Sequence, residues 1–309
     1  MGLPIWGAKA QPTPYPSKTV KLVIPYPPGG GTDITGRAMA QRLSELLGQS
    51  VVIENRPGAT GMIGAAGVAK SAPDGYSVLF GAASEMAINV SLFKTMTYDP
   101  RNDFEPVSLV ATFPLVFVAP ASRPESLAQL IDAARTKPAS VSYGSIGSGS
   151  PQHLAAELLS SMAKVKFLHV PYRGEAPAIT GLLTGDFDFI AATTGPISER
   201  IRNGELRALA VTGPKRAAAA PEIPTVGEAG LPGYVVTGWF GLLAPAKTPS
   251  AIIERLNAEI NRVLPSLRER HAELGTELVG GSPAEFRTFI ASELDKWARV
   301  VKASGAKPE

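Results

Sequence analysis

The chain has 309 residues, of which 44% are hydrophobic and 18% charged, so it is long enough for two lobes of roughly 100 to 200 residues, each with a normal core. The formal net charge is only +3 and basic residues are scattered among acidic ones, which argues against nucleic acid as a partner. The absence of cysteine excludes disulfides, thiolate zinc sites and cysteine nucleophiles. The most apolar tracts, such as residues 107–121 with Pro114 inside, fall short of the roughly 20 residues of a membrane-spanning helix.

The first residues have features of an export signal. Residues 2–7 are mostly apolar, and Ala8-Lys9-Ala10 has the small-x-small form of a signal-peptidase site. We therefore expect residues 1–14 to be a signal-peptide remnant or a flexible N-terminus.

Strand-like runs alternate with amphipathic helical stretches through most of the chain, a pattern typical of βαβ units. We therefore expect an α/β fold with mixed, mostly parallel sheets flanked by helices. In chain order, strands are predicted at 20–24, 51–53, 78–80, 141–143, 167–170, 187–191, 206–211 and 235–243. Helices are predicted from 32 or 33 to 47, from 151, near 176–184 and 196–203, from 248 and from 282.

Two of the helices carry more specific signals. Ser122 and Glu125 are expected to form a capping box ahead of a helix that begins near Leu127. In the last helix, one apolar stripe is interpreted as a packing face and not as a partner site. The residues of this stripe are Phe286, Phe289, Ile290, Leu294, Trp297 and Val301.

Three loops rich in small residues stand where a strand is predicted to end and a helix to begin. Glycine lets a ligand approach the backbone closely, and unpaired N–H groups at a helix N-terminus favour a carboxylate or a phosphate. Because ligands of open α/β sheets bind beyond the carboxyl ends of the strands, several such loops in succession favour one cleft. The candidate contacts in these loops are Pro28, Gly29, Gly30, Gly31, Thr32 and Asp33; Ser145, Gly147, Ser148, Gly149 and Ser150; and Gly174, Glu175 and Ala176.

Each loop also has a simpler interpretation as a turn followed by a capped helix. Asp33 and Ser150 would then be N-caps, and Pro151 would be a first-turn proline. For a single loop this interpretation is preferred, and only the succession of loops favours a ligand cleft.

Enzyme signatures are mostly absent from the sequence. The first predicted strand is not followed by G-x-G-x-x-G, no G-K-[ST] occurs, and the loop around Ser145 and Ser148 does not match G-x-S-x-G. The three histidines, His153, His169 and His271, are too widely spaced for an H-E-x-x-H zinc site. We therefore expect no catalysis, no metal and no cofactor.

A series of ordered motifs between residues 15 and 305 resembles the Bug family, the extracytoplasmic receptors of tripartite tricarboxylate transporters. The motifs are PPGGGTD at 27–33, ENRPGA at 54–59, APDGY at 72–76, YDP at 98–100, DFEPV at 103–107, QHL at 152–154, HVPY at 169–172, LRALAVT at 206–212, PTVGEAG at 224–230 and WFG at 239–241. Their number and order make the resemblance more specific than any one motif.

The resemblance implies a two-lobed periplasmic binding protein fold of type II. The first lobe would be discontinuous, 15–108 plus 237–309, and the second would be 109–236, with the chain crossing between them near 107–111 and 235–240. A ligand carboxylate would lie between the glycine loop at 28–33 and the second-lobe loops at 145–150 and 174–176. Backbone amides and bridging waters would make much of the contact, and His153 would lie beside the ligand carboxylate.

Ligand specificity is expected from less constrained positions, namely Tyr26, residues 82–85 with Ala83 and Ser84, and Thr193, Thr194 and Gly195. Residues 192–196 depart from the Asn-containing forms of amino-acid binders in the family, which favours a dicarboxylate or an aromatic carboxylate. The expected partners are this small molecule and integral-membrane transporter subunits, with the receptor a periplasmic monomer. A carboxylate sensor for a membrane signalling partner and an enzyme on the same fold are the alternatives.

Overall fold

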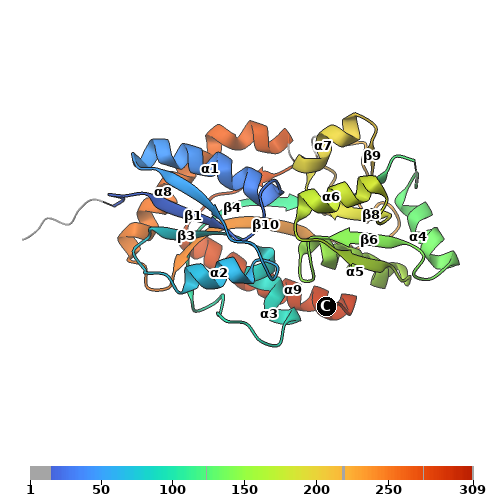
Figure 1. The fold of residues 1–309 in the computed structure, drawn as a ribbon, viewed down its shortest axis with the longest axis horizontal. Helices are drawn as coiled ribbons and strands as arrows, with labels where there is room; N and C mark the ends of the chain where they lie inside the picture. The colour runs from blue at the N-terminus through green and yellow to red at the C-terminus, as the bar shows by residue number, and fades with distance from the viewer. Residues whose placement is uncertain (1–14, 123, 218–219, 274, 308–309) are drawn as a thin grey trace, which may run out of the picture.

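The computed structural model describes residues 15–122, 124–217, 220–273 and 275–307, and its core is two β-sheets set side by side, each covered by helices (Figure 1). This arrangement confirms the predicted α/β class with two mixed sheets. The expected export segment, residues 1–14, lies outside the described residues. No helix in the described ranges is long and apolar enough to cross a membrane.

The first sheet has the strand order β11-β4-β10-β3-β1-β2. Its strands are β1 (Val20–Ile24), β2 (Val51–Asn55), β3 (Ser77–Ala82), β4 (Phe104–Pro114), β10 (Thr237–Pro245) and β11 (Glu277–Leu278). β1 pairs in parallel with β2 and β3, whereas β10 runs antiparallel to β3 and β4. Around this sheet pack α1 (Gly31–Leu47), α2 (Met62–Ala69), the π-helical turn η1 (Ser84–Ile88), α3 (Asn89–Leu92), α8 (Ser250–Glu273) and α9 (Pro283–Ser304). We call this half the first lobe.

The second sheet has the strand order β7-β6-β8-β5-β9. Its strands are β5 (Val116–Pro120), β6 (Ser142–Ser145), β7 (Leu168–Pro171), β8 (Phe189–Ala192) and β9 (Leu206–Val211). β6 pairs in parallel with β7 and β8, and β5 runs antiparallel to β8 and β9. With α4 (Leu127–Thr136), α5 (Pro151–Ala163), α6 (Glu175–Thr184) and α7 (Thr194–Arg202), it forms the second lobe. The C-terminal helix α9 packs on α5, so it contacts both lobes.

The chain passes between the sheets at a compact node. β4 pairs with β10 as far as Pro114, and β5 of the other sheet begins two residues later, so Leu115 is the first crossing. The Thr212 hydroxyl accepts from Leu115 N at 2.8 Å and donates to Val236 O at 2.6 Å, which ties both crossings to the end of β9. The expected crossing at 107–111 lies inside β4, and we therefore propose Leu115 and Val236 as the lobe boundaries.

Several predicted helix ends can be compared with the structure. Ser150 caps α5, and Ser282 with Glu285 forms a capping box on α9. The capping box predicted for Ser122 and Glu125 is wrong, because Ser126 caps α4 by accepting from Gln129 N.

The apolar stripe of the last helix faces the core. Phe286, Ile290, Leu294 and Trp297 are buried, and Phe289 and Val301 pack beside them. The interpretation as a packing face is therefore confirmed.

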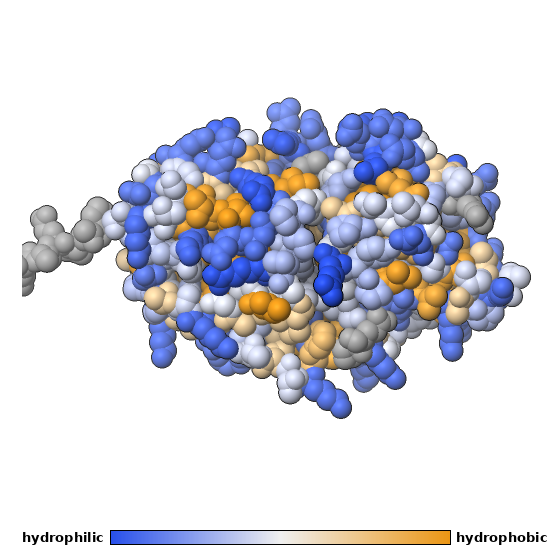
Figure 2. Space-filling view, in the orientation of Figure 1, coloured by the Kyte–Doolittle hydropathy of each residue, from blue (hydrophilic) through white to orange (hydrophobic). Residues whose placement is uncertain are grey.

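The outer surface is mixed in polarity. On the face shown in Figure 2, apolar side chains gather in small separate patches among hydrophilic ones. Scattered apolar side chains of this kind are normal on a protein surface and need no partner to explain them.

A buried glutamate fixes the turn that follows β3. Glu85 in η1 accepts from Ala82 N at 2.5 Å and from the Tyr26 hydroxyl at 2.7 Å, and its carbonyl accepts from the Tyr98 hydroxyl at 2.7 Å. Burial raises the pKa of Glu85 to about 7, although the hydrogen bonds from Tyr26 and Ala82 oppose the shift. The network joins the loop after β1 to the turn after β3.

We predict that Glu85 makes the stability of the fold depend on pH. Since its folded pKa of about 7 exceeds the ordinary value of 4.5, the folded chain binds this proton more tightly than the unfolded chain. The contribution of Glu85 to the free energy of unfolding therefore falls as the pH rises from about 4.5 to about 7, by on the order of 3 kcal/mol. In urea unfolding at about pH 5 and about pH 8, Glu85→Gln should lose less stability than the wild type. Equal losses in the two proteins would contradict the assignment.

Candidate functional site

A narrow cavity lies between the two lobes, at the carboxyl ends of the parallel strands. It is formed by the loops after β1, β3, β6, β7 and β8, together with the crossing ends of β4 and β10. About 40 Å³ is open to water-sized molecules. An adjoining hollow of about 630 Å³ shares Tyr26, Pro27, Ile146 and Gly174 with the cavity. In this conformation the cavity has room for only a few waters.

The glycine loop at the start of α1 forms one side of the cavity. Gly30 is the N-cap residue of α1, so the expectation that Asp33 caps this helix is wrong. A Cβ atom added to Gly31 would lie 2.8 Å from Thr193 Oγ1 of the second lobe. Glycine is required at position 31 because the two lobes approach each other so closely there.

Asp33 does not line the cavity but is hydrogen-bonded to the glycine loop on its far side. Its Oδ2 accepts from Gly29 N at 3.1 Å and from Arg37 Nε at 2.8 Å, and its Oδ1 accepts from Asn55 Nδ2 at 3.0 Å. Burial raises the pKa of the carboxyl, but the hydrogen bonds from Arg37, Asn55 and Gly29 outweigh it, and the pKa is lowered. Asp33 therefore stays ionised and holds the glycine loop in shape.

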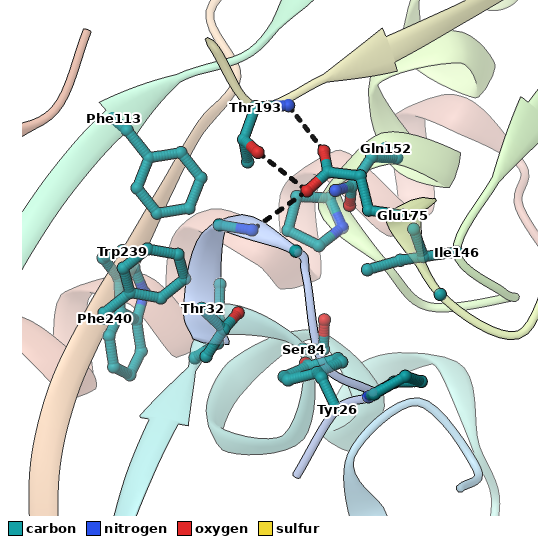
Figure 3. Close-up of a pocket in the computed structure, with 17 residues that line it drawn as sticks. Tyr26, Thr32, Ser84, Phe113, Ile146, Gln152, Glu175, Thr193, Trp239 and Phe240 are labelled. Atoms are coloured by element: carbon teal, nitrogen blue, oxygen red, sulfur yellow. Dashed lines mark hydrogen bonds between the residues drawn. The ribbon is translucent and has the colours of Figure 1, made fainter. Parts of the chain in front are cut away.

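Glu175, at the start of α6, reaches across the cavity with its carboxylate. Figure 3 shows Oε2 accepting from Gly31 N and Thr193 Oγ1, and Oε1 accepting from Thr193 N. These bonds are 3.1, 2.7 and 2.6 Å long. Burial raises the pKa of Glu175, and the bonds from Thr193, Gly31 and Gln152 oppose the shift. The Gly31 amide, which we expected to bind a ligand carboxylate, thus donates to the carboxylate of Glu175.

Three residues that line the cavity each carry a buried polar atom with no hydrogen-bond partner among the described residues. These atoms are Ser84 Oγ, Gln152 Oε1 and Trp239 Nε1. The Tyr26 hydroxyl beside Ser84 is committed to Glu85. Buried polar groups are normally paired, so three unpaired ones on residues of one cavity call for a polar partner there, either water or a ligand. The hydroxyl and the indole N–H can both donate, and the Gln152 amide can present either end.

Three aromatic residues form a wall along one side of the cavity, and Trp239, with its unpaired N–H, is one of them. Phe113, Trp239 and Phe240 stand on one side of the cavity in Figure 3, with Gln152 and Glu175 on the other. The ring centroids of Phe113 and Phe240 are 4.4 Å apart. Such a wall suits the flat or apolar body of a small organic molecule.

The structure brings part of the predicted site together at the cavity. The predicted residues that line it are Tyr26, Gly30, Gly31, Thr32, Ala83, Ser84, Gly174, Glu175 and Thr193. Two others lie close by, since Thr194 lines a small neighbouring hollow with Gly31, and Gly147 lines the adjoining hollow at the entrance.

The other predicted residues have positions around the cavity without lining it. They are Pro28, Gly29, Asp33, Ser145, Ser148, Gly149, Ser150, His153 and Ala176. The Ser148 carbonyl accepts from Thr60 Oγ1 at 2.7 Å across the lobes, and Ser145 Oγ is bonded to His169 Nε2 at 2.6 Å. These contacts shape the second-lobe loop.

His153 also supports this loop. It is buried, and its Nδ1 accepts from Gly149 N at 3.3 Å. Burial, together with the nearby His169, lowers the pKa of His153 to about 3, so the ring stays neutral. A neutral, inward-facing histidine positions the loop and does not carry charge to the cavity.

Some lining residues were not predicted as contacts. They are Pro27, Phe113, Ile146, Pro151, Gln152, Trp239 and Phe240, and also Ala82 from the stretch considered for specificity. Gln152, Trp239 and Phe240 belong to the motifs QHL and WFG, so the sequence contained a signal that could have identified them as site residues. Phe113 had none, because only the pairing of β4 with β10 brings it to the cavity.

The part of the chain that the structure describes contains no group of three or more His, Asp or Glu side chains arranged to hold a metal ion.

Comparison with known proteins places the chain among receptors. Residues 35–306 match the Tripartite tricarboxylate transporter family receptor. Protein BugT of Bordetella pertussis is 38% identical over 297 residues, which cover 95% of this chain and 91% of BugT. The structure of R. palustris Rpa4515 with adipate has 38% identity and a TM-score of 0.93, covering 96% of this chain and 100% of that one.

A second solved structure agrees. MatC from Rhodopseudomonas palustris with bound malate is 31% identical, with a TM-score of 0.88, and the match covers 93% of this chain and 100% of MatC. The match to the receptor family spans most of the chain, as the ordered motifs predicted. The chain therefore belongs to the tripartite tricarboxylate transporter receptor family and is a receptor of the Bug type.

Proposed function

We propose that the chain is a periplasmic receptor that binds a small organic carboxylate between its lobes and delivers it to the membrane subunits of a tripartite tricarboxylate-type transporter. The observation that carries this proposal is the set of three unpaired polar atoms of Ser84, Gln152 and Trp239 at one interlobe cavity. The adipate and malate bound to Rpa4515 and MatC are both carboxylates, which supports the ligand class.

The cavity can recognise a carboxylate through neutral donors. None of the described residues that line it is Lys, Arg or His. The Ser84 hydroxyl and the Trp239 indole N–H are available to donate to it. The aromatic wall takes the body of the ligand. We therefore propose a dicarboxylate or an aromatic carboxylate.

Entry requires the lobes to separate, and the node of Leu115, Thr212 and Val236 is the place where they can turn. Few chain segments cross there, and a hinge of this kind needs only small changes in a few backbone angles. We propose that the receptor, as a monomer, closes on its ligand and presents the closed form to the transporter.

We propose binding without chemistry at this site. Ser84 Oγ has no hydrogen-bonded base in the described part of the chain. The two carboxylates nearby are committed, Glu175 to Gly31 and Thr193, and Glu85 to Tyr26 and Ala82. Ser84 therefore has no base to activate it as a nucleophile, and neither glutamate is free to act as an acid or a base. This arrangement favours ligand binding over catalysis.

A thermal-shift series tests the function directly. A ligand that binds only the folded chain stabilises it by about 2.7 kcal/mol at a hundredfold excess over Kd. Adipate, malate, benzoate and terephthalate should include at least one compound that raises Tm, whereas the matched amides adipamide and benzamide should not. If none of a broad panel of carboxylates raises Tm, the proposed function is wrong.

Ser84→Ala tests the polar side of the cavity. A hydrogen bond to a charged group contributes about 1.5 to 3 kcal/mol, so the Kd of the carboxylate found above should rise at least about tenfold in calorimetry. Ser292→Ala, on the exposed surface of α9, is the matched control and should leave Kd unchanged. An unchanged Kd in Ser84→Ala would remove Ser84 from the site.

A further inference from the structure

Glu175 is buried at the boundary between the lobes, and all its bonds are made within the protein. It is 6% exposed, and its carboxylate accepts from Gly31 N of the first lobe as well as from Thr193 N and Oγ1 of its own lobe. A carboxylate offers about four lone-pair positions and these three bonds occupy most of them, so little acceptor capacity is left for a ligand.

The glycine loop is shaped to receive these second-lobe groups. A Cβ atom at Gly30 would lie 3.5 Å from Glu175 Oε2, and one at Gly31 would lie 2.8 Å from Thr193 Oγ1. Gly31 also begins α1, where unpaired N–H groups and the positive end of the helix dipole favour a negative charge. The first lobe therefore offers an anion site, and Glu175 fills it from the second lobe.

From the sequence we expected the glycine loop to bind the ligand carboxylate. In the structure two different sets of groups are available, one for a carboxylate of the protein and one for the ligand. The amide of Gly31 binds a carboxylate of the protein, while the unpaired atoms of Ser84, Gln152 and Trp239 remain for a ligand. The bond to Gly31 exists only when the lobes are close, because its donor and its acceptor come from different lobes. Breaking it would leave a buried carboxylate with one donor fewer.

We propose, on the basis of the receptor function above, that Glu175 is a positioning residue that latches the lobes: its carboxylate occupies the anion site at the start of α1 and stabilises the closed receptor by itself. The carboxylate of the ligand then binds at Ser84, Gln152 and Trp239 and does not compete for Gly31.

The absence of cysteine makes a direct test possible. Cysteines introduced at exposed Gln41 on α1 and exposed Lys137 after α4 place one spin label on each lobe of the full-length chain. Double electron–electron resonance then measures the distribution of distances between the labels without added ligand. The wild type should show a closed population, and Glu175→Gln should reduce it at least about twofold, because an amide nitrogen replaces one acceptor oxygen.

Matched variants separate the latch from a general loss of folding. Glu199→Gln removes an exposed carboxylate of α7 and should leave the distances unchanged. Thr193→Val should open the lobes as Glu175→Gln does, whereas Thr193→Ser keeps the hydroxyl and should restore closure. Unfolding midpoints of all variants, measured by circular dichroism, identify any that fail to fold.

Identical distance distributions in the wild type and Glu175→Gln would overturn the latch, and so would closure that survives in Thr193→Val. This failure is distinct from failure of the receptor function. The function fails when no carboxylate raises Tm in the wild type, whatever the spin labels report.

Discussion

A carboxylate can be buried only if hydrogen bonds replace the water that it loses, and this constraint governs how the two sheets meet. Glu175 satisfies it with donors from both lobes, Gly31 on one side and Thr193 on the other. The glycines of the first loop and the N-terminus of α1 are arranged around that contact. The geometry of the closed cavity therefore depends on an interaction within the protein and not only on the ligand.

The cavity that results combines weak, neutral donors with an apolar wall. Neutral donors such as a hydroxyl and an indole N–H bind a carboxylate less strongly than arginine does, so the ligand can also be released. Under the proposed transport function such release is needed, because the receptor would have to deliver its ligand. The buried network of Glu85, Tyr26 and Ala82 fixes the opposite side of the cavity, which limits how the ligand can lie.

Much of the fold could be predicted because its signals are local. The strands at 20–24 and 206–211 were predicted with the bounds that the structure shows, since each is a short apolar run between polar or turn residues. β4 and β5 were missed because residues 104–120 form one long apolar stretch, buried in two different sheets, whose division at Leu115 depends on pairing with distant strands. The turn η1 was missed because it depends on burying Glu85. The hydrogen bonds that make this burial possible come from Tyr26 and Tyr98, which are distant in the sequence.

The site was predictable to the extent that it consists of loops. Glycine-rich segments after strands pointed to Gly30, Gly31 and Gly174, all of which line the cavity. The same reasoning included Asp33 and Ser150, and the family resemblance added His153. The side chains of all three support the loops and do not line the cavity. The aromatic wall was not predicted as part of the site, because Phe113 and Phe240 come together only through the register of β4 with β10.

The most direct test is a crystal structure of the receptor, purified without denaturation and crystallised with the carboxylate that most raises Tm. We expect the ligand in the interlobe cavity, its carboxylate within hydrogen-bond distance of Ser84 Oγ, its body against Phe113 and Phe240, and Glu175 still hydrogen-bonded to Gly31. A ligand carboxylate on the Gly31 amide with Glu175 turned away, or a ligand bound outside the cavity, would contradict this expectation.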